Sequence, residues 1–112
     1  MNLFSIPEKI PEEFSQLLAL SNNCRVERIV SQGHHSPENF WYTQTEDELI
    51  FLLAGNALLD FGHCQVFMIA GDMLLIPAHL KHRVEATSHT PPCVWLCIFG
   101  YFNHPILQET QP

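Results

Sequence analysis

Histidine is the residue type that most invites a chemical interpretation in this chain, where 7 histidines stand beside only 5 lysines and arginines together. Imidazole changes its charge near neutral pH and is a common ligand of transition metals. His82 is the most informative, because charged residues alternate with His82, Val84 and Ala86 in the segment from Lys81 to Ala86. A β-strand with this alternation turns His82 toward the buried side, with Val84 and Ala86, and leaves Arg83 outside.

A carboxylate and an amide are predicted to face the same interior. Glu48 directly precedes the apolar run Leu49–Ala54, and strand alternation places it on the face of every second residue of that run. Just upstream, Phe40, Tyr42 and Gln44 share one face of an expected strand. Imidazole, carboxylate and amide oxygen can together hold a divalent metal, with Gln44 as the weakest donor.

Two further residues have alternative interpretations. His79 lies in an expected turn, where it is either a fourth metal ligand or a solvated side chain. If Val26 and Val30 face inward, Arg28 does too, and it offers a guanidinium to a carboxylate or phosphate. The opposite register places Ile29 inside and Arg28 in solvent.

The remaining histidines and the cysteines predict less. His34 and His35 are adjacent, so on an extended segment at most one can join a site, and we expect a loop there. The 4 cysteines have apolar neighbours and form no C-x-x-C pair. We therefore expect free thiols, as in a reducing compartment.

The elements that must position these residues are short apolar runs separated by turn residues. Val, Ile, Phe and Trp content predicts strands over residues 24–31, 40–44, 49–54, 57–61, 65–69, 73–76, 82–86 and 93–102. Pro11, two acids and the helical spacing of Phe14, Leu17 and Leu18 predict a short amphipathic helix over residues 11–21. Many short strands indicate an all-β sandwich or small barrel.

Length and charge narrow the function classes. The 112 residues fit one domain, and 46% apolar residues are enough for a core. The net charge of -7, with no basic run, argues against nucleic acid or an anionic membrane as partner. Apolar runs such as Leu49–Ala54 are far shorter than the roughly 18 residues of a membrane span. The N-terminus lacks a basic stretch followed by an apolar core, so we expect a cytoplasmic protein.

Two motifs give the chain a family resemblance. Glu48 to Gly55 has the form E-x6-G, and Gly71 to His82 has the form G-D-x4-P-x4-H. Together they resemble the two motifs of the cupin superfamily over about residues 24–102. The resemblance implies a double-stranded β-helix (jelly-roll) barrel, here preceded by the short helix. It also implies a metal set of two histidines from H-x-H, a glutamate and a later histidine.

Carried over by position, the implied glutamate is Glu48 and the later histidine is His82. The H-x-H positions fall on Tyr42-Thr43-Gln44, where this sequence departs from the pattern. The first functional hypothesis is therefore a metal-dependent oxygenase, isomerase or lyase that binds zinc, iron, nickel or manganese. Its candidate metal ligands are Gln44, Glu48, His82 and His79.

The alternative hypotheses need no metal. A non-catalytic binding or sensory module would hold a small organic molecule in a pocket lined by Tyr42, Phe40 and Arg28. A structural or interaction protein would fill the pocket with its own side chains. In each case we expect a homodimer, with the apolar last strand, Val94 to Phe102, as the interface.

Overall fold

The computed structural model describes residues 1–102, and within these residues the chain forms strands and no helix. In chain order the strands are β1 (Phe14–Leu20), β2 (Arg25–Ser31), β3 (Asp47–Ala54), β4 (Asn56–Asp60), β5 (Gln65–Ile69), β6 (Met73–Ile76), β7 (Arg83–Thr87) and β8 (Cys93–Gly100). No helix capable of crossing a membrane occurs in this part of the chain.

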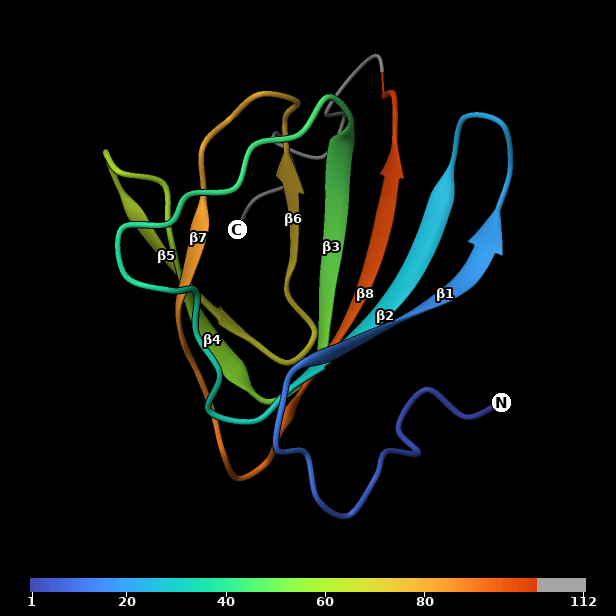
Figure 1. Ribbon diagram of the computed structural model, residues 1–112, viewed down its shortest axis with the longest axis vertical. Coiled ribbons are helices and arrows are strands. Elements are labelled where there is room, and N and C mark those ends of the chain that lie inside the picture. The colour runs from blue at the N-terminus through green and yellow to red at the C-terminus, as the bar shows by residue number, and fades with distance from the viewer. Residues whose placement is uncertain (103–112) are drawn as a thin grey trace.

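The strands form two antiparallel sheets that face each other (Figure 1). The larger sheet has the order β1-β2-β8-β3-β6, and the smaller has the order β5-β4-β7. Alternate residues of β3 point into the space between the sheets, so that Glu48, Ile50 and Leu52 are buried while Leu49 and Phe51 are only half-buried. This is the alternation expected from the sequence, and the all-β prediction is confirmed.

Gly55 passes the chain from the larger sheet to the smaller one, because it is the single residue between β3 and β4. Its φ of 83° lies in the left-handed region, which glycine enters at little cost. A Cβ at this position would lie 2.8 Å from Ser88 Oγ and 2.9 Å from Cys93 Cα. The glycine that ends the E-x6-G motif is thus required for two reasons: the left-handed backbone conformation and the lack of room for a Cβ atom.

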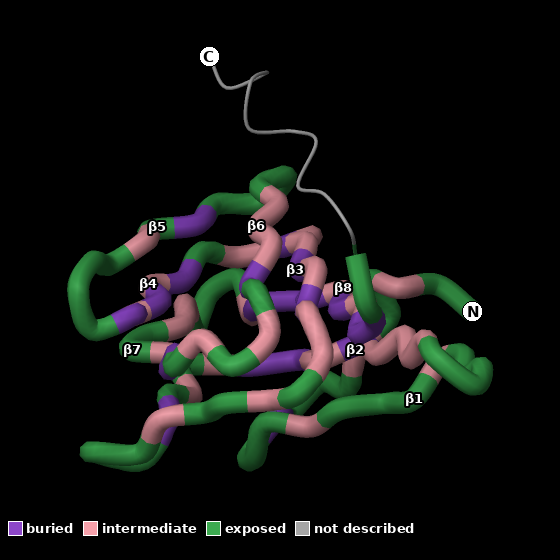
Figure 2. Tube along the Cα trace, turned by 90° about the horizontal axis from the view of Figure 1, so that it is seen from above, coloured by how far each residue is buried: buried purple, intermediate pink, exposed green. Residues whose placement is uncertain are grey.

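The predicted helix over residues 11–21 is wrong. Most of that segment is strand β1, which pairs with β2 from Phe14 to Leu20. Phe14 and Leu18 are four residues apart, a spacing that puts them on one face of a strand as well as of a helix, and both are half-buried. An isolated helix shorter than about 12 residues is marginal, so pairing with β2 prevails. Figure 2 shows β1 as a largely exposed edge strand.

The expected strand over residues 40–44 is reduced to one bridge. Tyr42 donates its backbone N–H to the His82 carbonyl over 2.8 Å, and His82 donates to the Tyr42 carbonyl over 3.1 Å. The surrounding segment, 32–46, is a long connection that leaves the larger sheet after β2, passes beside the smaller sheet and returns to the larger sheet at β3. This bridge is nevertheless sufficient to fix Tyr42 beside His82.

Strand β7 follows the predicted alternation only in its first half. His82 is buried and Val84 half-buried, but Ala86 is exposed, because the pairing of β4 with β7 shifts register between Leu58 and Leu59. A bulge of this kind moves later side chains to the other face. Arg83, expected in solvent, is buried and donates to the carbonyls of Pro37 and Ser36.

The last strand is not the free sheet edge that the predicted dimer contact assumed. β8 pairs with β2 on one side and β3 on the other, so its backbone groups are already used. A second copy therefore cannot add to it edge to edge. The homodimer itself stays a prediction.

Gly55→Ala should destabilise the fold by about 2–4 kcal/mol, through left-handed strain and a clash with Cys93. Gly71→Ala is the matched control: its φ is 97°, yet a Cβ there would have no atom within 4 Å, so only strain of about 1 kcal/mol remains. Urea denaturation followed by circular dichroism measures both. Equal losses in the two variants would contradict the close approach at Gly55.

Candidate ligand cavity between the sheets

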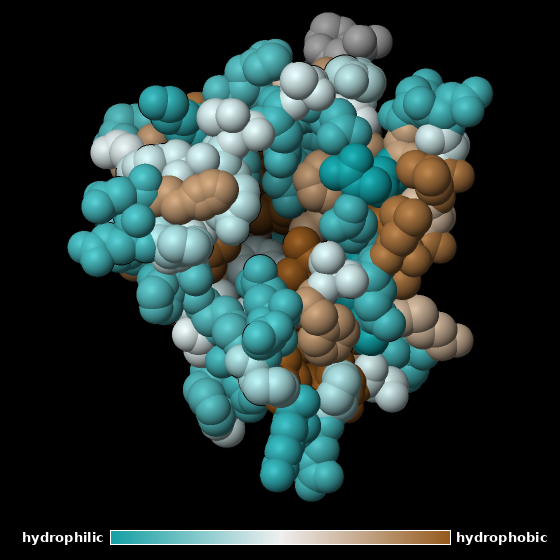
Figure 3. Space-filling model, viewed as in Figure 1, coloured by the Kyte–Doolittle hydropathy of each residue, from teal (hydrophilic) through white to brown (hydrophobic). Residues whose placement is uncertain are grey.

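A cavity of about 260 Å³ lies between the two sheets. Its walls are apolar side chains from both sheets, among them Ile29, Ile50, Leu59, Ile76, Val84 and Trp95. The face drawn in Figure 3 is hollowed near its centre, and hydrophobic side chains are visible in the depth of the hollow. Typical ligand pockets measure roughly 300–1,000 Å³ and are mostly apolar. The volume here suits a molecule smaller than a typical drug.

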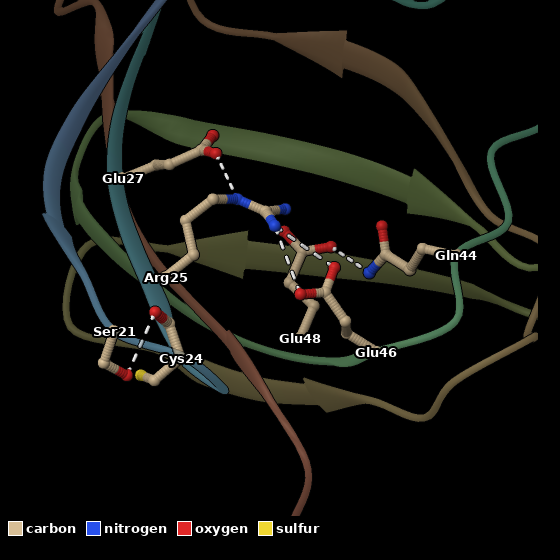
Figure 4. A network of polar contacts seen from close by, with 7 residues as sticks. All are labelled: Ser21, Cys24, Arg25, Glu27, Gln44, Glu46 and Glu48. Carbon is tan, nitrogen blue, oxygen red and sulfur yellow. Dashed lines mark hydrogen bonds and ion pairs between the residues drawn. The ribbon is translucent and has the colours of Figure 1, made fainter.

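Glu48 supplies a buried carboxylate to this cavity, with only 8% of the residue exposed. Burying a carboxylate is costly unless hydrogen bonds compensate. Gln44 donates from Nε2 to Glu48 Oε1 over 2.9 Å (Figure 4). Burial, the negative charge of Glu48 and a hydrogen bond to it raise the pKa of the Cys97 thiol well above its ordinary value. Cys97 therefore stays protonated beside the Glu48 carboxylate.

His82 faces Glu48 from the opposite wall and is 7% exposed. Its Nδ1 lies 3.0 Å from the Leu80 carbonyl oxygen. A carbonyl only accepts hydrogen bonds, so Nδ1 carries a proton and the neutral ring has its lone pair on Nε2. Nε2 lies 3.7 Å from Glu48 Oε1, which is beyond hydrogen-bond length.

The Glu48–His82 pair therefore has an unusual geometry. With a neutral imidazole, two acceptors face each other without a proton between them, too far apart to bond and close enough for one positive group to reach both. That group can be a proton on Nε2, a metal ion or a donor on a bound molecule. The arrangement can hold or move a proton at Nε2 next to an apolar cavity.

Four of the predicted site residues come together here. Tyr42, Gln44, Glu48 and His82 all line the cavity, and the rings of Tyr42 and His82 lie 6.2 Å apart. Their meeting follows from the Tyr42–His82 bridge and from the position of Glu48 at the start of β3.

The other three predicted residues lie elsewhere. His79 is exposed in the turn before β7, with a φ of 68°. Phe40 is exposed and packs its ring 4.6 Å from that of Tyr42. Arg28 is on the opposite face of β2, because Ile29 faces the cavity. It is not in solvent either, since it bonds Gln16 Oε1 and the Leu3 and Ser5 carbonyls.

The cavity has further lining residues beyond these candidates. Trp95, Cys97 and Phe99 line it from β8, and their alternate spacing was a usable signal for a shared face. His35 also lines it, in agreement with the expectation that at most one of the adjacent histidines could join the site. Glu13 reaches it from the segment before β1. Because this residue falls in the helix expected from the sequence, the sequence pattern does not place Glu13 at the cavity.

Arg25, Glu27 and Glu46 form an ionic cluster (Figure 4) next to Phe99, one of the cavity-lining residues. The Arg25 guanidinium lies 4.1 Å above the Phe99 ring. Its Nε bonds Glu27 over 2.6 Å, and its Nη1 lies 3.1 Å from Glu46. The charge of Arg25 is therefore already balanced by these two carboxylates.

The residues present fit a divalent metal only in part. Among residues 1–102, no group of three or more His, Cys, Asp or Glu side chains is arranged to hold a metal ion. Glu48 and His82 supply two donors, and Gln44 turns its nitrogen rather than its oxygen toward Glu48. Metal sites in proteins ordinarily use at least three protein ligands.

The fold and cavity define a small β-barrel protein with a candidate ligand site between its sheets. Residues 27–99 match the cupin domain family, and the chain belongs to this family. No curated protein matches it. It is similar to a Ralstonia eutropha protein named "putative mannose-6-phosphate isomerase", with 35% identity, a TM-score of 0.86, and coverage of 91% of this chain and 97% of that one. A cupin superfamily protein from Desulfitobacterium hafniense shares the fold, with 21% identity, a TM-score of 0.73, and coverage of 87% and 84%.

Asp47 anchors the turn that leads to His82, and its loss should show a defined pH dependence. Its carboxylate accepts from the backbone N–H groups of Phe102 and Ala78, both at distances below 3 Å, and these bonds lower the pKa of Asp47. A lowered folded-state pKa stabilises the fold above the unfolded pKa, and this contribution disappears as the pH falls through the folded value. Asp47→Ala should cost about 1 kcal/mol at pH 7.

The difference between wild type and Asp47→Ala should shrink as the pH falls below about 4. Denaturation at a series of pH values measures it. A difference that stays constant down to pH 2 would show that the carboxylate charge contributes nothing to the anchor.

Proposed function

We propose that this cupin binds a small organic molecule in the cavity between its sheets, where Glu48 and His82 act on it as a proton-transfer pair. The observation that carries the proposal is their geometry, a buried carboxylate and a buried imidazole 3.7 Å apart at the wall of an apolar cavity. Clefts with convergent polar groups in apolar surroundings are the usual form of small-molecule sites.

The chemistry follows from where the protons lie. Nδ1 of His82 carries a proton and donates it in a hydrogen bond to the Leu80 carbonyl oxygen. Nε2 is therefore the atom that accepts a proton from a bound molecule. Glu48 then stabilises the imidazolium, and Gln44 keeps that carboxylate in place. Returning the proton to a neighbouring atom completes an isomerisation, and losing a leaving group completes an elimination.

The name of the Ralstonia protein supports the reaction class. Sugar isomerases move a proton between adjacent carbons, which requires a base beside the substrate. That protein is 35% identical to this chain over nearly its whole length. The sugar phosphate in its name is not part of this proposal, because phosphate recognition needs cationic or N–H donor groups that face the cavity.

A divalent metal is the second candidate, favoured by the same pair of acceptors. His82 and Glu48 would hold the ion, which would supply a Lewis acid beside the cavity. Such a site would be held by two strong donors and the weak Gln44. The metal-dependent oxygenase, isomerase or lyase expected from the family resemblance belongs to this candidate.

Filling the cavity should abolish ligand binding. Val84 lines the cavity from β7, whereas Leu58 on neighbouring β4 does not. A thermal-shift screen of small organic molecules should yield compounds that stabilise the wild type and Leu58→Phe but not Val84→Phe. A compound present at 100 times its Kd adds about 2.7 kcal/mol. Stabilisation of Val84→Phe by the same compounds would place their site elsewhere.

Metal content separates the two candidates. Protein purified without chelator or nickel resin should contain far less than one zinc, iron, nickel or manganese per chain, with no difference between wild type and His82→Ala. Elemental analysis by mass spectrometry measures this. A nearly stoichiometric metal that His82→Ala removes would favour the metal-dependent candidate over the proposal.

A further inference from the structure

The charges around the cavity are distributed unevenly. Two carboxylates, Glu13 and Glu48, line it. The chain has 5 lysines and arginines, all within the described residues, and none of them lines the cavity. A bound molecule would therefore meet negative charge and no permanent positive charge.

Each lysine and arginine is either bonded to other groups of the protein or exposed on the surface. Arg25 bonds Glu27 and Glu46, and Arg28 bonds Gln16 and two carbonyls on the outer face of β2. Arg83 bonds the carbonyls of Ser36 and Pro37 and pairs with Glu85. Lys9 and Lys81 are exposed. None of the three arginines can turn into the cavity without giving up these contacts.

The remaining surroundings favour a cation. Nε2 of His82 and Oε1 of Glu48 are two acceptors with no donor between them. The aromatic rings of Tyr42 and Trp95 line the same cavity, and ring faces attract cations. The net charge of -7 adds a long-range field of the same sign.

We infer that the cavity takes a small organic cation, an amine or ammonium group on an apolar body, and rejects phosphates and carboxylates. This inference rests on the proposed function and names its substrate class. The positive nitrogen occupies the position between Glu48 and His82, and the apolar body lies against the aromatic and aliphatic walls. A sugar phosphate carries the opposite charge.

Compounds of one shape and different charge test the inference. Benzylamine, benzyl alcohol and benzoate differ in the group that would meet Glu48, and mannose 6-phosphate represents the sugar phosphates. Titrations followed by protein NMR, with EDTA present to remove metals, give Kd values. We expect benzylamine to bind about tenfold more tightly than benzyl alcohol, and benzoate and mannose 6-phosphate not to bind.

Two charge-neutralising variants test whether Glu48 causes the preference for benzylamine. Glu48→Gln keeps the size of the side chain and should reduce the preference for benzylamine to less than twofold while retaining benzyl alcohol binding. Glu8→Gln removes one charge from an exposed position and should leave the preference unchanged. If Glu48→Gln does not fold, Glu13→Gln, at an exposed residue, should weaken benzylamine binding without affecting benzyl alcohol.

The outcomes separate the inference from the function on which it rests. Tighter binding of benzoate or mannose 6-phosphate, or equal binding of all head groups, would overturn the cation assignment and leave a small-molecule cavity in place. Binding of no compound, in this panel or in the thermal-shift screen, would overturn the proposed function and the inference together. An equal loss of preference in Glu8→Gln would assign it to the overall charge and overturn the role of Glu48.

Discussion

The burial of one carboxylate constrains the interior of this barrel. Glu48 begins a face of β3 that continues with Ile50 and Leu52 in the core, and its charge can remain there only if donors surround it. The amide of Gln44 donates to it, the protonated thiol of Cys97 lies beside it, and His82 closes the opposite side. Gln44 belongs to the long connection before β3 and Cys97 to β8, so the carboxylate links three separate parts of the chain.

Strand pairing and backbone hydrogen bonds around Glu48 hold this carboxylate in place. β3 is paired on both sides, with β8 and β6, so the backbone beneath Glu48 has little freedom. Asp47, the preceding residue, fixes the turn at Ala78 through a backbone hydrogen bond. From that turn the chain reaches His82, whose backbone bridge to Tyr42 ties the connection to the smaller sheet. The distance between Glu48 and His82 is therefore set by backbone contacts.

How far the sequence predicted this site depended on which contacts each residue makes. Glu48 and His82 stand in segments with clear strand alternation, and period-2 patterns report directly on the buried face. The position of Arg28 could not be decided from the sequence, because both registers were compatible with its neighbours. Its partners are Gln16, in the expected helix, and the carbonyls of Leu3 and Ser5, where no element was predicted. Pairing with the next strand, β2, turned residues 14–20 into a strand, and their own apolar spacing, which fits a helix as well as a strand, could not show it.

The departure at Tyr42-Thr43-Gln44 explains why charge, rather than metal chemistry, becomes the dominant property of the cavity. Histidines at the outer two positions would have offered further acceptors to an ion shared with Glu48 and His82. Gln44 instead donates to Glu48, so it occupies an acceptor site on the carboxylate and leaves its negative charge in place. Tyr42 adds a ring face beside His82. The same two changes that weaken the ligand set for a metal thus produce an aromatic, negatively charged cavity, which has the chemistry of a receptor for a positively charged nitrogen.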